Sequence, residues 1–406
     1  MNADHIRMTD HGENIERCRK AEGRITNHES RITRSRRDRW SRLFAAAVLL
    51  LIGGCANVSY YWQSVSGQLD VWWRERPVEE VIADPAVAET LKHKLARVLE
   101  IRAFASRELG LPDNPSYRRY ADLERPYAVW NVLATPEFSV QPLEWCFPFA
   151  GCVSYRGYFA REAAERFSAE LVEQGYDAYV GGVPAYSTLG WFADPVLNTF
   201  IHYPEAELAR LVFHELAHQV LYVRDDTVFN ESFAVSVERE GVRRWLARSG
   251  DAKQREQYER QQRIRAEFSG LIQDYRKQLD ALYRSRLAPD AMRERKRAAF
   301  TGLEAEYRAL RAGWNGYGGY DRWFEQRPNN AQIASVAIYT QHVPAFEALL
   351  KREDGDLTRF YAAVRQLAAL PSEEREERLR ALVPQATLQR EPGGQDLNRQ
   401  EKQGKH

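Results

Sequence analysis

Apolar residues recur every three or four positions over long stretches of this chain, a spacing that places them on one face of a helix. Val81–Glu108 shows this pattern with few helix-breaking residues, and Arg161–Gln174 shows it again before Gly175 ends the run. Another helix is expected to begin at Asn329 and to continue through Tyr339. The pattern therefore predicts a mainly helical protein.

Shorter segments are rich in β-branched and aromatic residues, a composition that favours strands. Tyr127–Val140 has this composition and is punctuated by prolines, and Tyr176–Val183 and Tyr186–Phe192 have it as well. We expect short strands in all three segments. Together with the helices, they predict an α+β fold in which helix predominates.

The most densely charged part of the chain lies at residues 251–312. Arg, Lys, Glu and Gln alternate there with sparse apolar residues, and Pro289 interrupts the pattern. This favours two long helices that form a solvated hairpin with charge pairs four residues apart. A partner-binding coiled coil is the alternative, although no heptad repeat is sustained.

The N-terminal segment has the organisation of an export signal. The arginine-rich stretch Arg31–Arg42 precedes an apolar run, Leu43–Ile52, that is too short to span a bilayer. The run ends Ile-Gly-Gly-Cys, which is the pattern of a bacterial lipobox. We therefore expect residues 1–54 to be a lipoprotein signal peptide and Cys55 to carry the lipid. An ordinary secretory signal cleaved nearby is the alternative.

Removal of this segment changes the formal net charge from +1 to −3, because its basic residues outnumber its acidic ones by four. A chain this close to neutral has no electrostatic field that favours nucleic acid, so no nucleic-acid partner is expected. The N-terminal arginines belong to export, where positive charge stays cytoplasmic.

Two of the four cysteines lie close together in the exported part. Cys146 and Cys152 are separated by the turn-like sequence Phe-Pro-Phe-Ala-Gly. An oxidising compartment permits a local disulfide at this spacing. No further Cys or His lies nearby to complete a metal site, so we predict a disulfide between Cys146 and Cys152.

The run His214-Glu-Leu-Ala-His218 has the spacing of a zinc-binding helix. Residues four apart lie on one helical face, so His214 and His218 can present their imidazoles to one ion. Glu215 projects toward the same cleft, where its carboxylate can take a proton from water on the metal. Two surface histidines on an ordinary helix are the alternative, but the neighbouring residues are apolar, as a buried helix requires.

A catalytic zinc ion needs a third protein ligand. A polar turn, Arg224–Thr227, follows the histidines, and a second helix is expected to begin near Asn230. Two helices joined by so short a turn would bring Glu231 back against the histidine pair. Glu238 is the other candidate ligand, although a capping or supporting role suits it better.

The HExxH motif followed by Asn230-Glu-Ser-Phe-Ala resembles the gluzincin metallopeptidases, although these usually have more residues between the two helices. The resemblance implies that His214, His218 and Glu231 bind Zn²⁺ and that Glu215 is the general base. It also implies a zincin-like core with an edge strand on which an extended peptide substrate binds. We expect that strand at residues 186–190.

A wider segment, from Cys146 to Gly241, is similar to the bacterial putative aminopeptidases, a lipoprotein-like and zinc-dependent group. The matching motifs are Cys152-Val-Ser-Tyr-Arg-Gly-Tyr-Phe, Ala185-Tyr-Ser-Thr-Leu-Gly-Trp-Phe-Ala-Asp-Pro, Phe213-His-Glu-Leu-Ala-His-Gln and Phe229-Asn-Glu-Ser-Phe-Ala. The similarity covers most of the chain after Cys55, except about the last thirty residues. We therefore expect a zincin-like metallopeptidase domain at residues 55–389, with the hairpin 251–312 as an insertion, and a disordered tail at 390–406.

Two further roles have candidates. Zinc peptidases commonly stabilise the transition-state oxyanion with a Tyr or His beyond the metal helices. Tyr339 is our first candidate and His342 the second, and either residue is otherwise a member of the core. An aminopeptidase must also hold the α-amine of its substrate, for which Asp194 and Asp226 are candidates.

Together these features predict a zinc-dependent enzyme that hydrolyses peptide bonds, an aminopeptidase acting on peptides in the periplasm. By resemblance to Gram-negative lipoproteins, Ala56 after the lipidated cysteine indicates sorting to the outer membrane. The protein would be lipid-anchored there and would face the periplasm. A zinc endopeptidase or protein-processing enzyme, and a non-catalytic interaction lipoprotein of the envelope, are the alternatives.

Overall fold

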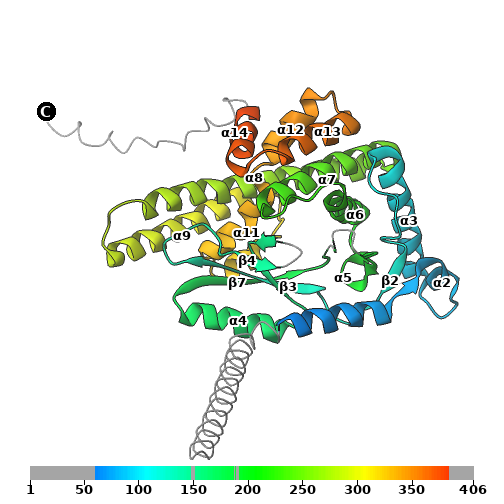
Figure 1. Cartoon of the computed structure of the whole chain (residues 1–406), viewed down its shortest axis with the longest axis horizontal. Helices are drawn as coiled ribbons and strands as arrows, with labels where there is room; N and C mark the ends of the chain where they lie inside the picture. Colours follow the sequence, from blue (N-terminus) through cyan, green and yellow to red (C-terminus); the bar gives the residue numbers. More distant parts are fainter. Residues whose placement is uncertain (1–59, 148–150, 187, 189–191, 384–406) are drawn as a thin grey trace, which may run out of the picture. The chain divides into compact units, whose positions relative to one another are not determined.

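Figure 1 shows the computed structural model of the chain, which divides into two compact units, Met1–Ser66 and Gly67–His406. The fold described below is that of the second unit. The structure describes all residues except 1–59, 148–150, 187, 189–191 and 384–406. Helices predominate and the sheets are small, so the predicted mainly helical α+β fold is confirmed. The expected signal peptide, Cys55 and the C-terminal tail lie outside the described residues.

The largest sheet has the strand order β6-β3-β7. Its central strand β3 (Val129–Pro136) pairs antiparallel with β6 (Arg156–Tyr158) and with β7 (Tyr176–Val183). The helices α4 (Arg161–Glu173) and α11 (Asn330–Thr340) pack on opposite sides of this sheet (Figure 1). Because both faces are covered, β3 is buried along most of its length. The strand predicted at Tyr176–Val183 and the helix before it are confirmed.

Two smaller sheets hold the remaining strands. One has the order β1-β2-β8, with β1 at Arg76–Pro77, β2 at Arg119–Ala121 and β8 at Val196–Leu197. The other is the pair β4 (Trp145–Phe147) and β5 (Gly151–Val153). Cys146 and Cys152 face each other across this pair and are joined by a disulfide.

The strand predicted at Tyr186–Phe192 is wrong for the residues described there. Tyr186, Thr188 and Phe192 are not in a strand. The backbone N–H and the hydroxyl of Thr188 both donate to the carboxylate of Asp194, at 3.1 and 2.7 Å. These side-chain hydrogen bonds give Thr188 a partner in place of the backbone partner that a strand would supply.

Helices α6 (Glu205–Val220) and α7 (Thr227–Ser249) form the centre of the main core. Gly241 lies where α7 approaches α6, and a Cβ atom there would come within 2.6 Å of the Phe213 ring. The close contact of the two helices therefore depends on the absence of a side chain at this position. The described part of the unit also contains the helices α2 (Val78–Ala83), α3 (Glu89–Leu109), α5 (Asn198–Ile201), α10 (Asp321–Glu325), α12 (Val343–Arg352), α13 (Leu357–Ala368) and α14 (Ser372–Leu382).

The charged segment forms the helices α8 (Ala252–Tyr283) and α9 (Pro289–Ala312), with Pro289 in the first turn of α9. Contrary to the expectation of a solvated hairpin, its sparse apolar residues form a second buried core. This core contains Ile264, Phe268, Leu271, Ile272, Tyr275, Leu279, Leu303 and Tyr307. Because these residues recur at helical spacing, they share inward faces, while most of the charged residues point outward.

The glycine- and aromatic-rich segment after α9 closes this second core. Tyr320 stacks on Phe268 with ring centroids 3.8 Å apart, and Trp314 is also buried. Among the residues that the structure describes, no helix combines the length and the apolar character needed to cross a bilayer.

Candidate metal centre

Helix α6 places His214 and His218 one turn apart on the same face. Most of the residues around them on this helix are buried and apolar, so the two imidazoles lie in the interior of the fold. Their Nε2 atoms are 3.2 Å apart. Two ring nitrogens that face each other at this distance within a buried pocket are well placed to bind one cation.

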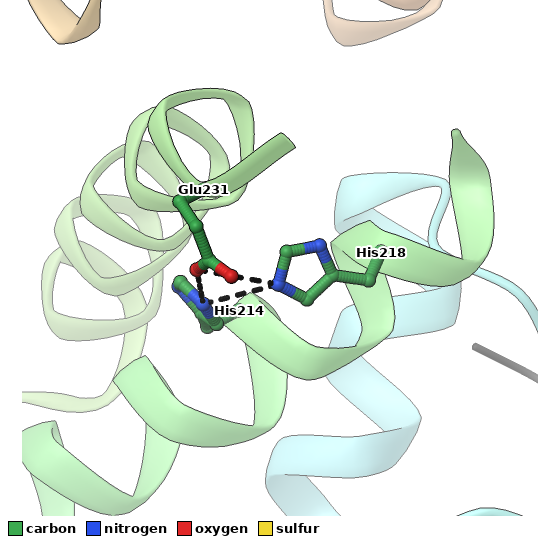
Figure 2. A group of neighbouring side chains, drawn as sticks. All are labelled: His214, His218 and Glu231. Carbon is green, nitrogen blue, oxygen red and sulfur yellow. Dashed lines mark hydrogen bonds and ion pairs between the residues drawn. The ribbon is translucent and has the colours of Figure 1, made fainter. Parts of the chain in front are cut away.

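Glu231 completes the cluster from the next helix. It lies in the second turn of α7, which begins at Thr227, a few residues earlier than the start we expected near Asn230. Its Oε2 atom is 3.2 Å from Nε2 of His214 and 3.6 Å from Nε2 of His218. Figure 2 shows the carboxylate directed at both rings. The structure therefore brings together the three residues that the sequence nominated as ligands.

These distances fit a zinc ion. In a tetrahedral site with bonds of about 2.0–2.2 Å, the ligand atoms lie roughly 3.3–3.6 Å apart. The three donor atoms are 3.2–3.6 Å apart, and two imidazoles with one carboxylate form a ligand set that zinc uses in catalytic sites. Within the described residues, no other group of three or more His, Cys, Asp or Glu side chains converges in this way.

The electrostatics of the cluster also suit a cation. Burial by itself would lower the pKa of His214, but the carboxylates of Glu231 and Glu238 raise it to about 10. Burial would raise the pKa of Glu231, but the two histidines lower it to about 2. A proton on His214 thus compensates part of the negative charge of the two carboxylates, and a cation bound at the cluster would compensate it in the same way.

Glu238 contacts His214 on the side of the imidazole ring away from Glu231. Its Oε2 atom is 2.9 Å from Nδ1 of His214, the ring nitrogen on the far side from Glu231. A carboxylate in this position fixes the tautomer and the orientation of a ligating imidazole. Arg210 in turn donates to Glu238 at 3.2 Å. The structure thus separates the two candidate carboxylates, with Glu231 at the shared centre and Glu238 behind it.

Glu215 lines a cavity of about 430 Å³ beside the cluster, together with His214 and Tyr339. Burial raises the pKa of Glu215, while the positive charge of the two histidines opposes this shift. The carboxyl group is close enough to both histidines to respond to their charge, and it is not one of the three converging ligands. It is therefore available to exchange protons with a molecule in the cavity.

The two oxyanion candidates lie in different surroundings. Tyr339 lines the cavity, with its ring centroid 6.4 Å from that of His214. The charge of Glu231, together with burial, raises the pKa of Tyr339 well above its usual range, so the hydroxyl stays protonated and can donate. His342 instead pairs with Glu376 at 3.0 Å and does not line the cavity.

The two candidates for binding the substrate amine both have structural partners. Asp226 caps α7 by accepting from the backbone of Phe229, and it pairs with Arg375 at 2.8 Å. Asp194 is only 4% exposed and accepts hydrogen bonds from Thr188 and Gln219. Neither carboxylate lines the cavity beside the metal cluster.

The comparisons with known proteins agree with this geometry. A family model described as "Putative aminopeptidase" matches residues 59–379. The chain belongs to the putative aminopeptidase family. No curated protein and no solved structure matches it. In this family member, the match includes α6 and α7, the sheet β6-β3-β7 and the charged hairpin.

Sequence reasoning missed several residues around the centre of this family member. Arg210 lies one turn before His214 on α6. Residues four apart share a helix face, and this spacing is the signal in the sequence that could have placed Arg210 beside His214. Helix α8 contributes residues from Gln262 to Ser269 to the cavity wall. No pattern in the sequence around these residues predicts that they line a cavity. These residues lie more than forty positions from the histidines in the sequence, and only packing brings them close.

We predict that Glu238→Gln weakens the binding of added zinc by about 10- to 100-fold, because the carboxylate that orients His214 loses its charge and its pairing with Arg210. Competition with a chromophoric chelator measures this affinity. Glu240→Gln on the same helix is the matched control, since Glu240 pairs with arginines away from the metal cluster. Equal zinc affinity in the two variants would show that packing alone orients the ring.

Asp194 makes the stability of the fold depend on pH. Burial raises its pKa from 3.8 to about 7, although hydrogen bonds from Thr188 oppose the shift. A carboxyl group whose pKa is raised on folding favours the folded state at low pH, and this contribution is lost as the pH rises toward 7.

Asp194→Asn removes this titration and keeps an oxygen that accepts from Thr188. The free energy of unfolding of Asp194→Asn relative to the unmutated protein is therefore expected to rise with pH. Between about pH 4 and 7 the slope approaches roughly 1.4 kcal/mol per pH unit. Denaturant unfolding at several pH values measures it, with the exposed Asp274→Asn on α8 as control. A difference that stays constant from pH 4 to 8 would contradict the shift.

Proposed function

We propose that this chain is a zinc-dependent metallopeptidase with a zincin-like core and that it acts as an aminopeptidase. The observation that supports this most directly is the convergence of His214, His218 and Glu231, whose ligand atoms all lie within 4.8 Å of one another. The family description supports action on the amino end of peptides. Zinc bound there supplies Lewis-acid chemistry, which polarises a peptide carbonyl and makes water a nucleophile near neutral pH.

The proton transfers, the stabilisation of the oxyanion and the orientation of His214 are then carried out by side chains of this protein. Glu215 accepts a proton from the attacking water and later delivers it to the leaving amine. The protonated hydroxyl of Tyr339 donates a hydrogen bond to the carbonyl oxygen as negative charge develops on it. Glu238 and Arg210 hold the His214 ring in place throughout.

The sheet offers a place for the peptide backbone. β7 is an edge strand of the β6-β3-β7 sheet, and the residues at its end, Val183, Pro184 and Ala185, line the cavity beside His214. An extended peptide can add to such an edge by backbone hydrogen bonds. This edge takes the place of the strand expected at residues 186–190.

We further propose that Cys55 is lipidated and anchors the protein to the outer membrane, where it faces the periplasm. The support is the lipobox and the alanine that follows it. Because Cys55→Ser removes the residue that would carry the lipid, we expect it to release the protein from the membrane fraction into the soluble periplasmic fraction. Cell fractionation with immunoblotting measures the change, and Cys55→Ser protein that stays with the outer membrane would contradict the anchor.

Glu215→Gln tests the proposed chemistry. We expect it to retain one zinc ion per chain and to lower the hydrolysis of an unblocked peptide library by at least about 10³-fold, because the general base is lost. Metal analysis and a mass-spectrometric digest of the soluble Cys55→Ser form measure both quantities. Glu256→Gln, an exposed glutamate on α8, is the control for the loss of a carboxylate.

Two further results would favour the alternative functions. Cleavage of N-acetylated peptides as fast as unblocked ones identifies an endopeptidase or processing enzyme. An unmutated protein that binds no zinc, or an envelope function that persists unchanged in Glu215→Gln, supports a non-catalytic interaction lipoprotein instead.

A further inference from the structure

A second cavity, of about 480 Å³, lies between α7 and α8. Two of its wall residues, Arg239 and Gln262, also line the cavity at the metal cluster, so the two cavities adjoin. The mechanism described above does not use this second cavity. Helix α8 of the charged hairpin forms one wall of this cavity, and α7 with Glu347 of α12 forms the other.

The second cavity is predominantly basic. Four arginines line it, and they are Arg239, Arg243, Arg255 and Arg263. The carboxylates that face them are those of Glu259 and Glu347, and Glu347 already pairs with Arg239 at 2.8 Å. Arg243 pairs with Glu240, while Arg263 has no ion pair with any of the described residues. The cavity wall thus has positive charge in excess.

Two buried polar groups in the same wall lack partners. The hydroxyl of Tyr258 and the amide nitrogen Nε2 of Gln262 make no hydrogen bond within the described part of the chain. Tyr258 is only 7% exposed, and both residues line the second cavity. A buried donor without an acceptor is unfavourable and is rare in folded proteins. Because Tyr258 and Gln262 both line the cavity, an oxygen atom bound there is a candidate acceptor for these two donors.

We propose that this arginine-lined cavity binds a carboxylate group of the peptide substrate while the scissile bond lies at the metal cluster. The proposal rests on the proposed peptidase function and names its substrate class. Guanidinium groups match the two oxygens of a carboxylate, and the hydroxyl of Tyr258 and the amide of Gln262 supply further donors. Because Arg239 and Gln262 line both cavities, one extended peptide can reach from the metal cluster into this cavity.

The carboxylate has two sources in a peptide, the C-terminus and an acidic side chain. The first source would select short peptides, and the second would select an acidic residue at a fixed distance from the cleaved bond. Three peptides of equal length distinguish them, one with a free C-terminus, one with a C-terminal amide, and one amidated peptide that ends in glutamate.

Binding of these peptides to full-length Glu215→Gln protein, measured by fluorescence anisotropy, tests the proposal without requiring hydrolysis. We expect at least one of the two carboxylate peptides to bind roughly tenfold or more tightly than the plain amide. The peptide that does so identifies the source. Equal affinity for all three peptides, or no measurable binding of any, would overturn the proposal.

Variants of cavity residues test whether the preference for the carboxylate peptide arises in this cavity. Adding Tyr258→Phe or Arg263→Gln is expected to reduce the preference for the carboxylate peptide by roughly tenfold, because each removes one donor to a charged group. Tyr258→Phe removes only an unpartnered hydroxyl, so its melting temperature is expected to be unchanged or higher. Arg308→Gln is the matched control, since Arg308 is exposed on α9, pairs with Glu304 and does not line the second cavity. A preference that survives both cavity variants would place carboxylate recognition elsewhere.

The two proposals fail in different ways. An unmutated protein that binds no zinc and cleaves no peptide, but still distinguishes the acid from the amide through Tyr258 and Arg263, would contradict only the peptidase function. A protein that hydrolyses both peptides equally well and binds them equally in the Glu215→Gln form would contradict only the carboxylate site.

Discussion

The packing of α6 against α7 is the constraint on which the rest of the structure depends. It places two imidazoles and one carboxylate within a few ångströms of each other in the interior, where an unpaired charge is costly. The contact is possible because Gly241 leaves room for Phe213. Charge compensation between His214 and Glu231 makes the burial tolerable, and it leaves a site that a cation can occupy.

A line of alternating charges connects this centre to the hairpin. Arg265 of α8 donates to Glu207 at 2.6 Å, Glu207 accepts from Arg210 at 2.8 Å, and Arg210 donates to Glu238, which holds His214. Helix α8 of the hairpin thus supports His214, provides one wall of the cavity beside it and borders the second cavity. Its own core, around Phe268, gives these groups a rigid base.

Much of the site was predictable because its chemistry is local. Positions four apart on a helix share a face whatever the fold, so His214 and His218 followed from their spacing. The short connection to α7 limited the third ligand to Glu231 or Glu238. The strand Tyr176–Val183 was also predictable from composition. The non-strand conformation of Tyr186, Thr188 and Phe192 was not predictable, because no local pattern shows the hydrogen bonds that Asp194 accepts from Thr188.

The sequence by itself determined the placement of the two histidines on one helical face, the mainly helical architecture and the pairing of nearby cysteines. Only the tertiary structure decided between Glu231 and Glu238, which lie two turns apart on the same helix and differ in which nitrogen of His214 they meet. The tertiary structure also placed Asp226 at the N-cap of α7 and placed α8 of the charged hairpin beside the cavity. Periodicity fixes the face on which a side chain lies, whereas its partner across the core depends on how distant helices cross.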